Sequence, residues 1–545
     1  MAMGKEPKQS KNKIIAIAGT LLASSTAMII VIGVLAVVLV ALIAIGIVVG
    51  INSATSTDPM LNSTPTSAPT VPTSRPTAPT TLPTLPPTEP LPTQPPVPPE
   101  GGKYINVGGG YLAEVIQADV ETFDGGKFDD FSHPTNNYLP KGTVDYCAKD
   151  IIYGNGMKYV QLRSGHRVYY DKKVYPFPEE PVYQMIKEVK QYEGWLPDHN
   201  EINVAGFEVV GRHTVLTLDT LWKAPFYFET NQSGYANPDG GKDRDYAIVG
   251  NNITYVDITF CYATVYTGNV SIPVNHPLFR SAELIKNDFD CTLRLHLRKS
   301  GGFYGWQAYY NENDQLCFQF LNPAQVSGAD NAYGVNLNGA LVMIDVGHGG
   351  VDGGAAAYYC TTCEVNLMAP ELKRNKCPTC QTKPELLATE SQLNMSLALA
   401  LKAELESVGA TVVFNRTEDT NLNVNDRQAN LLEVAPDICI AVHQNSNNAT
   451  SVRGFFTMYY TPWSHLLSKY IRENTKEAGV YTRHVLQWSA AYFMCRQPVC
   501  PTVLTENGFM SNPKDLENMM NPEVVQTKAE TITQGVVDYF LAINQ

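Results

Sequence analysis

The chain has 545 residues, more than one hydrophobic core usually organises, so roughly two to four folded units are expected. Hydrophobic residues make up 44% and charged residues 17%, which excludes a wholly disordered or fibrous protein. Lys and Arg number 40 against 53 Asp and Glu, and the net charge of -13 has the wrong sign for binding phosphate backbones. Nucleic acid is therefore not an expected partner.

An uncharged stretch near the N-terminus predicts a single transmembrane helix. Residues 28–51 are apolar over more than the roughly 20 residues that a spanning helix needs. Residues 1–27 form a basic segment and the start of the apolar stretch, with four lysines and one glutamate before the first isoleucine. Positive flanks stay cytoplasmic, so we expect a single-pass protein of the cell membrane whose catalytic part is extracellular. A cleaved signal peptide ending at Ala27 is the alternative, but cleavage there would leave the span in place.

Residues 52–100 form a Pro/Thr-rich linker that cannot build a core. They hold 15 of the 36 prolines. Such composition favours an extended chain of about 3.1 Å per residue, a reach on the order of 100 Å from the membrane. This reach suits a target that is spread through a cell wall.

The middle region is predicted to be mostly β. Short alternating runs such as 215–220, 255–260 and 293–297 predict strands, and residues 303–320 predict a hairpin. The strand spacing over 101–172 weakly resembles an SH3-like β domain, and 173–335 is predicted to be a second β-rich domain. Neither contains a catalytic constellation, and their aromatic residues are read as core.

The chemistry concentrates in residues 340–545. Apolar runs at 341–344, 438–442 and 502–505 each precede a polar group, which is His348, His443 or Glu506. Open α/β sheets place their sites at the ends of such strands, so these three side chains are expected to converge.

Helical patterns alternate with these runs. Residues 391–408 and 523–543 carry apolar side chains at helical spacing, and residues 411–414 predict a further strand. Glu390 opens the first helix, where the helix dipole favours an ionised carboxylate. The expected fold is an α/β catalytic domain with a mixed sheet flanked by helices.

His348, Glu390 and His443 are two imidazoles and one carboxylate, the ligand set of a catalytic zinc with an open position for water. Glu506 would then be free to act as a base. Each residue taken alone has an ordinary reading as a loop, core or capping residue.

The sequence around these residues resembles the zinc-dependent N-acetylmuramoyl-L-alanine amidases of type 3. The resemblance spans about 340–545 and rests on several motifs in the family's order. They are Ile344-Asp345-Val346-Gly347-His348-Gly349-Gly350, Glu390, Arg416, Arg427, Ala441-Val442-His443-Gln444-Asn445, Gly454-Phe455, Tyr459-Tyr460, and Pro501 with Thr505-Glu506-Asn507-Gly508-Phe509-Met510-Ser511-Asn512. Val346 and Ala441 depart from the family's usual proline and serine, but neither is a ligand.

The resemblance implies roles for the four residues. His348, Glu390 and His443 would bind zinc, and Glu506 would be the catalytic glutamate. The substrate would be peptidoglycan, cut between N-acetylmuramic acid and the first L-alanine of the stem peptide, in cell-wall remodelling or peptidoglycan catabolism. Two rival readings stay open, which are another zinc peptidase acting on stem peptides and an inactive wall-binding protein. The sequence identifies no protein activator.

Four cysteines predict a second, structural zinc. Cys360, Cys363, Cys377 and Cys380 form two Cys-x2-Cys pairs at zinc-ribbon spacing, within an insertion over 358–384. The segment between the pairs is too polar to fold by apolar burial alone. A pair of disulfides is the alternative in an extracellular protein.

Overall fold

The computed structural model describes residues 104–105, 111–115, 120–123, 134–152, 158–169, 186–190, 196–197, 199–232, 250–488 and 492–545. All of them belong to one compact unit, Glu89–Gln545. The transmembrane helix predicted over 28–51 and the linker predicted over 52–100 lie outside the described residues. Within the part of the chain that is described, none of the helices combines the length and the apolar character required to cross a bilayer.

The middle of the chain is built from strands, as the sequence predicts. A seven-stranded sheet has the order β4 (Pro134–Leu139), β3 (Val120–Phe123), β7 (Arg167–Tyr169), β6 (Lys158–Leu162), β5 (Val144–Ile152), β2 (Tyr111–Val115) and β8 (Ile186–Lys190). Two short pairs are formed by β1 (Tyr104–Ile105) with β9 (Leu196–Pro197) and by β19 (Ser327–Gly328) with β20 (Val335–Asn336). The SH3-like assignment and the domain boundaries stay predictions.

Two further sheets form a β-sandwich. One has the order β14 (Ala263–Thr267), β10 (Asn200–Val210), β11 (His213–Thr220), β18 (Leu316–Leu321) and β17 (Trp306–Tyr310). The other has the order β12 (Phe226–Thr230), β13 (Tyr255–Phe260), β16 (Cys291–Leu297) and β15 (Phe279–Lys286). Aromatic rings from the two sheets meet between them, with Phe228 stacked on Trp306 at 3.9 Å and Phe226 edge-on to Phe318 at 4.6 Å. The antiparallel pair β17 and β18 is the hairpin predicted within 303–320.

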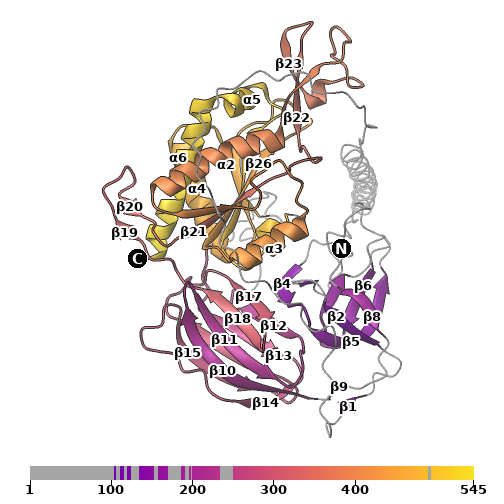
Figure 1. The fold of residues 1–545 in the computed structure, drawn as a ribbon, viewed down its shortest axis with the longest axis vertical. Helices are drawn as coiled ribbons and strands as arrows, with labels where there is room; N and C mark the ends of the chain where they lie inside the picture. Colours follow the sequence, from indigo (N-terminus) through magenta and orange to yellow (C-terminus); the bar gives the residue numbers. More distant parts are fainter. Residues whose placement is uncertain are drawn as a thin grey trace, which may run out of the picture. The chain divides into compact units, whose positions relative to one another are not determined.

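The C-terminal domain contains the predicted mixed sheet (Figure 1). Its order is β25 (Thr411–Phe414), β21 (Leu341–Val346), β26 (Ile438–Asn445), β29 (Thr502–Phe509), β27 (Phe455–Tyr459) and β28 (Thr482–Trp488). The first four strands are parallel, whereas β27 runs antiparallel to β29 and parallel to β28. The parallel strands β21, β26 and β29 are buried over almost their whole length because both faces of the sheet are covered.

Helices cover one face of this sheet. Alternate residues of β21 and β26 share a core with α2, α4 and α6, the first of which contributes Leu397, Leu401 and Leu405. The helices are α2 (Glu390–Ser407), α3 (Val424–Val434), α4 (His465–Glu477), α5 (Pro513–Met520) and α6 (Pro522–Ile543), with short 3-10 turns at η2 (Ala369–Glu371), η3 (Pro462–Ser464) and η4 (Met494–Arg496). The predicted helices 391–408 and 523–543 are confirmed within one residue at each end.

The opposite face packs against α3 and the β-sandwich. Met343 and Cys439, which point away from α2, belong to the same core as the sandwich residues. Phe303 is edge-on to Trp463 at 5.1 Å, and the Trp306 amide donates to the Pro498 carbonyl at 2.9 Å. The sandwich therefore serves as the second covering layer of the C-terminal mixed sheet.

A three-stranded ribbon leaves this domain before α2 and contains the four predicted thiolates. Its order is β23 (Val365–Met368), β22 (Ala356–Cys360) and β24 (Glu385–Thr389), all antiparallel. Figure 1 shows the ribbon extending beyond the helices. Because β24 ends at Thr389, the ribbon leads directly into Glu390.

Candidate active site

One loop, the start of a helix and two neighbouring strands bring the four predicted residues together. His348 follows β21 by two residues in a left-handed conformation with φ of 59°. Glu390 is the first residue of α2, and the helix starts there because Thr389 caps it by accepting from the Gln392 amide. The sequence predicts that His443 and Glu506 follow their strands, but both lie within them, because β26 and β29 stay paired through these two residues.

His348, Glu390 and His443 each offer a ligand atom, and these atoms lie within 4.8 Å of one another. The Glu390 Oε1 atom lies 3.2 Å from His348 Nε2 and 3.0 Å from His443 Nδ1. The two imidazole rings are nearly perpendicular, at 80°, with centroids 5.1 Å apart. Two nitrogens and one oxygen converging in this way can hold a divalent metal of the zinc type.

Glu390 is held as a carboxylate. It accepts hydrogen bonds from the amides of Ala355 at 3.0 Å and Gln444 at 3.1 Å. Burial opposes ionisation, but the hydrogen bonds and charges of His348 and His443 outweigh it and hold the pKa of Glu390 well below its usual range. An ionised Glu390 is the form that binds metal.

Glu506 has the opposite electrostatic character. Its side chain is only 6% exposed, and its Oε2 atom has no hydrogen-bond partner among the described residues. Burial, together with the negative charge of Glu390, raises the pKa of Glu506 well above its usual range. A buried carboxyl with a free oxygen and a raised pKa is a candidate for proton transfer.

Glycines leave room for these side chains. A Cβ atom on Gly354, whose φ is +67°, would lie 2.6 Å from Glu390 Oε2 and 2.8 Å from His348 Cδ2. A Cβ on Gly347 would overlap the ring of His443. The glycine-rich loop around His348 therefore serves close packing at the site as well as the turn.

Three further residues support the site, and none of them has a role predicted from the sequence. Asp352 Oδ2 lies 2.8 Å from His348 Nδ1, which leaves Nε2 toward Glu390. The Asn507 side chain donates to the His443 carbonyl at 2.9 Å, and Lys528 Nζ donates to the Asn507 carbonyl at 2.6 Å. Asp352 could have been found from the sequence, because it follows the candidate ligand His348 by four residues. Lys528 lies far from the candidate ligands in sequence, and no local pattern indicates its role.

The four ribbon cysteines also meet. Cys360, Cys363, Cys377 and Cys380 have sulfur atoms within 4.8 Å of one another, and none of the four forms a disulfide. The residue that follows each Cys-x2-Cys pair is left-handed, Glu364 with φ of 54° and Gln381 with φ of 62°. The two pairs thus form matching turns around one point.

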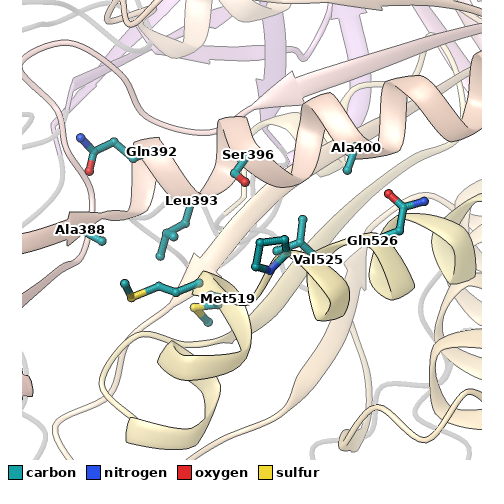
Figure 2. A pocket seen from close by; sticks show the side chains of 10 residues that line it. Ala388, Gln392, Leu393, Ser396, Ala400, Met519, Val525 and Gln526 are labelled. Atoms are coloured by element: carbon teal, nitrogen blue, oxygen red, sulfur yellow. The ribbon is translucent and has the colours of Figure 1, made fainter. Parts of the chain in front are cut away.

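A separate cavity of about 510 Å³ lies between the start of α2 and the helices α5 and α6 (Figure 2). None of the four candidate active-site residues lines it. Its walls are mostly apolar and are formed by Ala388, Gln392, Leu393, Ser396, Ala400, Met519, Met520, Pro522, Val525 and Gln526.

Comparison with known proteins identifies the family of the C-terminal domain. Residues 342–538 match the family model described as N-acetylmuramoyl-L-alanine amidase. The chain is 26% identical over 154 residues to N-acetylmuramoyl-L-alanine amidase LytC of Bacillus subtilis, covering 28% of this chain and 31% of LytC. It is 26% identical over 216 residues to "Probable cell wall amidase LytH" of Staphylococcus aureus, covering 39% of this chain and 63% of LytH. The chain thus spans less than two thirds of the length of these relatives.

Solved structures similar to the chain include the catalytic domain of CwlV, an N-acetylmuramoyl-L-alanine amidase from Bacillus (Paenibacillus) polymyxa, at 22% identity and a TM-score of 0.31, covering 37% of this chain and 99% of that one. Another is an N-acetylmuramoyl-L-alanine amidase from Clostridium difficile 630, at 25% identity and a TM-score of 0.30, covering 37% of this chain and 96% of that one. Residues 342–538 therefore form a domain that matches the type 3 family of N-acetylmuramoyl-L-alanine amidases.

Proposed function

We propose that this protein hydrolyses the amide bond between N-acetylmuramic acid and L-alanine in peptidoglycan. The observation that carries the proposal is the meeting of His348, Glu390 and His443 beside the buried Glu506, within a domain of the amidase family. The reaction needs a water whose pKa is lowered toward neutral pH and a group that moves its proton. His348, Glu390 and His443 would hold the metal for the first task, and Glu506 would serve the second.

The donor set fits zinc. His348 and His443 would supply nitrogens and Glu390 an oxygen, which are the ligand types of catalytic zinc sites. When bound there, zinc would lower the pKa of a water and polarise the amide oxygen. The unpartnered Oε2 atom of Glu506 fits a water or substrate at this position, since buried carboxylate oxygens normally have partners.

The protein's own residues then perform the proton transfers. Glu506, whose ionised form a nearby bound cation would favour, would take a proton from the attacking water and later give it to the departing alanine nitrogen. General acid and base catalysis of this type contributes typically about 10² to 10⁴-fold. Asp352 would keep the imidazole of His348 in one orientation throughout.

Purified peptidoglycan digested with the full chain distinguishes this function from its rivals. An amidase releases new N-terminal alanine without new reducing sugar ends. Another zinc peptidase acting on stem peptides would release other amines, and an inactive wall-binding protein would release none. His443→Ala is the control, because it removes one nitrogen of the proposed metal site.

We also propose that Cys360, Cys363, Cys377 and Cys380 bind a structural zinc. Four thiolates around one point suit this metal, and the sulfur separations are too long for disulfides. Zinc analysis of the purified protein tests the proposal, since two ions per chain are expected when both sites are filled.

The proposed location is the cell membrane, with the catalytic domain outside. This proposal is supported only by the sequence of residues 28–51 and its basic flank. Membrane fractionation of the full chain and of a variant lacking residues 1–51 tests it, because only the full chain should sediment with membranes.

A further inference from the structure

We propose that the metal bound by the four ribbon cysteines sets the metal affinity of the His348, Glu390 and His443 site, by fixing the position at which α2 begins. The inference rests on the proposed metal site of the amidase function. It makes the ribbon a positioning device for Glu390, since the thiolates themselves touch no substrate.

The ribbon geometry identifies the class of metal. Four thiolates about 2.3 Å from a zinc ion at tetrahedral angles have sulfurs about 3.8 Å apart. Here Cys360 Sγ lies 3.4 Å from Cys380 Sγ, and Cys363 Sγ lies 3.9 Å from Cys377 Sγ. A soft, tetrahedral divalent ion such as zinc matches this arrangement.

The path from this site to Glu390 is short and made of backbone. Ala356, the first residue of β22, is the register partner of Thr389, the last residue of β24. One residue further along, the Glu390 amide donates to the Ala355 carbonyl at 2.7 Å, and the Ala355 amide donates to Glu390 Oε2 at 3.0 Å. Pairing of β22 with β24 therefore fixes both the backbone and the carboxylate of Glu390.

The outer half of the ribbon has little apolar support of its own. Its small buried cluster consists of Cys360, Leu367 and Cys377, so two of the three members are thiolate ligands. Residues 373–376 between the pairs are all exposed. Loss of the metal would leave this half without a core, and short antiparallel strands without one are marginally stable in water.

The inner half of the ribbon is anchored near the other side of the site. Ala357 and Ala388 pack with Met510, and the amide of Met510 donates to the carbonyl of Asn445 at 2.7 Å. Met510 directly follows β29, the strand that contains Glu506. The ribbon base thus adjoins the ends of the two strands that contain His443 and Glu506.

The far side of the first turn of α2 borders the cavity, and there Leu393 packs with Leu516 and Met519 of α5. Figure 2 shows Gln392 and Leu393 on one side of the cavity and Met519 and Val525 on the other. The cavity of about 510 Å³ beside this cluster leaves room for the helix start to shift. The ribbon pairing is therefore one of the contacts that hold Glu390 against such a shift.

The test uses the full chain with Cys377 and Cys380 both changed to Ser, and Cys317→Ser as the matched control, because Cys317 is a buried free cysteine of the sandwich. We expect two zinc ions per chain in the control and one in the double variant. Competition with a chelating dye should show the remaining ion bound at least about 10-fold more weakly, in the range for loss of groups that orient metal ligands. Hydrogen exchange at the amides of Glu390 and Ser391 should accelerate.

A second measurement keeps the sequence unchanged. A mercurial that takes up thiols would release the ribbon zinc from the wild-type protein, and the same weakening at the remaining site is expected. One zinc per wild-type chain, or unchanged affinity and exchange after loss of the ribbon zinc, would overturn the inference. These readouts do not depend on wall digestion, so failure of the proposed amidase activity would be recognised separately by the absence of new N-terminal alanine from the wild-type protein.

Discussion

His443 and Glu506 are register partners on the neighbouring parallel strands β26 and β29. Partners on adjacent parallel strands point to the same face of the sheet, so a candidate metal ligand and a candidate base are placed side by side by backbone pairing alone. The same pairing buries Glu506 near the negative charge of Glu390. The site therefore carries an electrostatic cost that the fold must offset.

Removing the charge of Glu506 should stabilise the protein. Its pKa is raised in the folded state, so folded protein binds more protons than unfolded protein once the pH exceeds the ordinary glutamate value of 4.5. Stability of the wild type should fall as the pH rises from there, and Glu506→Gln should escape this loss. Urea unfolding of both proteins after identical chelator treatment checks this, and a stability gap that does not widen with pH would contradict it.

Asp352 should affect metal affinity through His348. Asp352→Ala removes the acceptor 2.8 Å from His348 Nδ1, so the imidazole loses its fixed orientation. We expect zinc affinity at this site to fall by about 10 to 100-fold with little change in unfolding temperature. Asp352→Asn retains an acceptor and should lose less. Equal affinity in the wild type and the alanine variant would show that Asp352 does not orient the ligand.

A methyl group added at Gly305, where the sandwich contacts the C-terminal domain, should lower the free energy of unfolding. Gly305 has φ of +139°, and a Cβ there would overlap the Val499 carbonyl oxygen and lie 2.7 Å from the Pro498 oxygen. Gly305→Ala should cost roughly 1–3 kcal/mol of unfolding free energy, the usual penalty of overpacking. Gly211→Ala is the control, since Gly211 also has positive φ, +58°, but a methyl group there would have no atom of the described residues within 4 Å. Equal losses in the two variants would remove the steric argument.

Lys528 should make the free energy of unfolding increase as the pH rises through the alkaline range. Burial lowers the pKa of Lys528 to about 8, although Asp515 opposes this, whereas the ordinary lysine value is 10.5. Between these values the unfolded chain binds the extra proton, so stability rises with pH, by up to about 3 kcal/mol. Lys528→Met should lose this rise, as measured by urea unfolding at pH 7.5, 9 and 10.5. Parallel pH profiles for the two proteins would contradict the assignment.

Much of the C-terminal fold is predictable from the sequence because it follows local periodicity. The strand over Thr411–Phe414 and the helix starting at Glu390 are given by apolar spacing and by the Thr389 and Gln392 capping pair. The mixed sheet is expected from the sequence, but the reversed direction of β27 depends on long-range pairing with β29, for which no local pattern exists.

The residues of the candidate site are predictable from the sequence, but their burial and their pKa values are not. Strand ends and motif order predict that His348, Glu390, His443 and Glu506 meet. The raised pKa of Glu506 and the support from Lys528 depend on burial by helices distant in sequence. The covering of the second sheet face by the sandwich is also not predictable, because it depends on shape matching between two apolar surfaces.

The central claim is tested most directly by the rate at which the wild type and Glu506→Gln release new N-terminal L-alanine from a defined muropeptide. The zinc content of each protein is measured on the same sample. The account predicts equal zinc content and a turnover lower by at least about 10²-fold in the variant, because the metal ligands remain while the proton-transfer group is lost. Equal turnover at equal zinc content would contradict it.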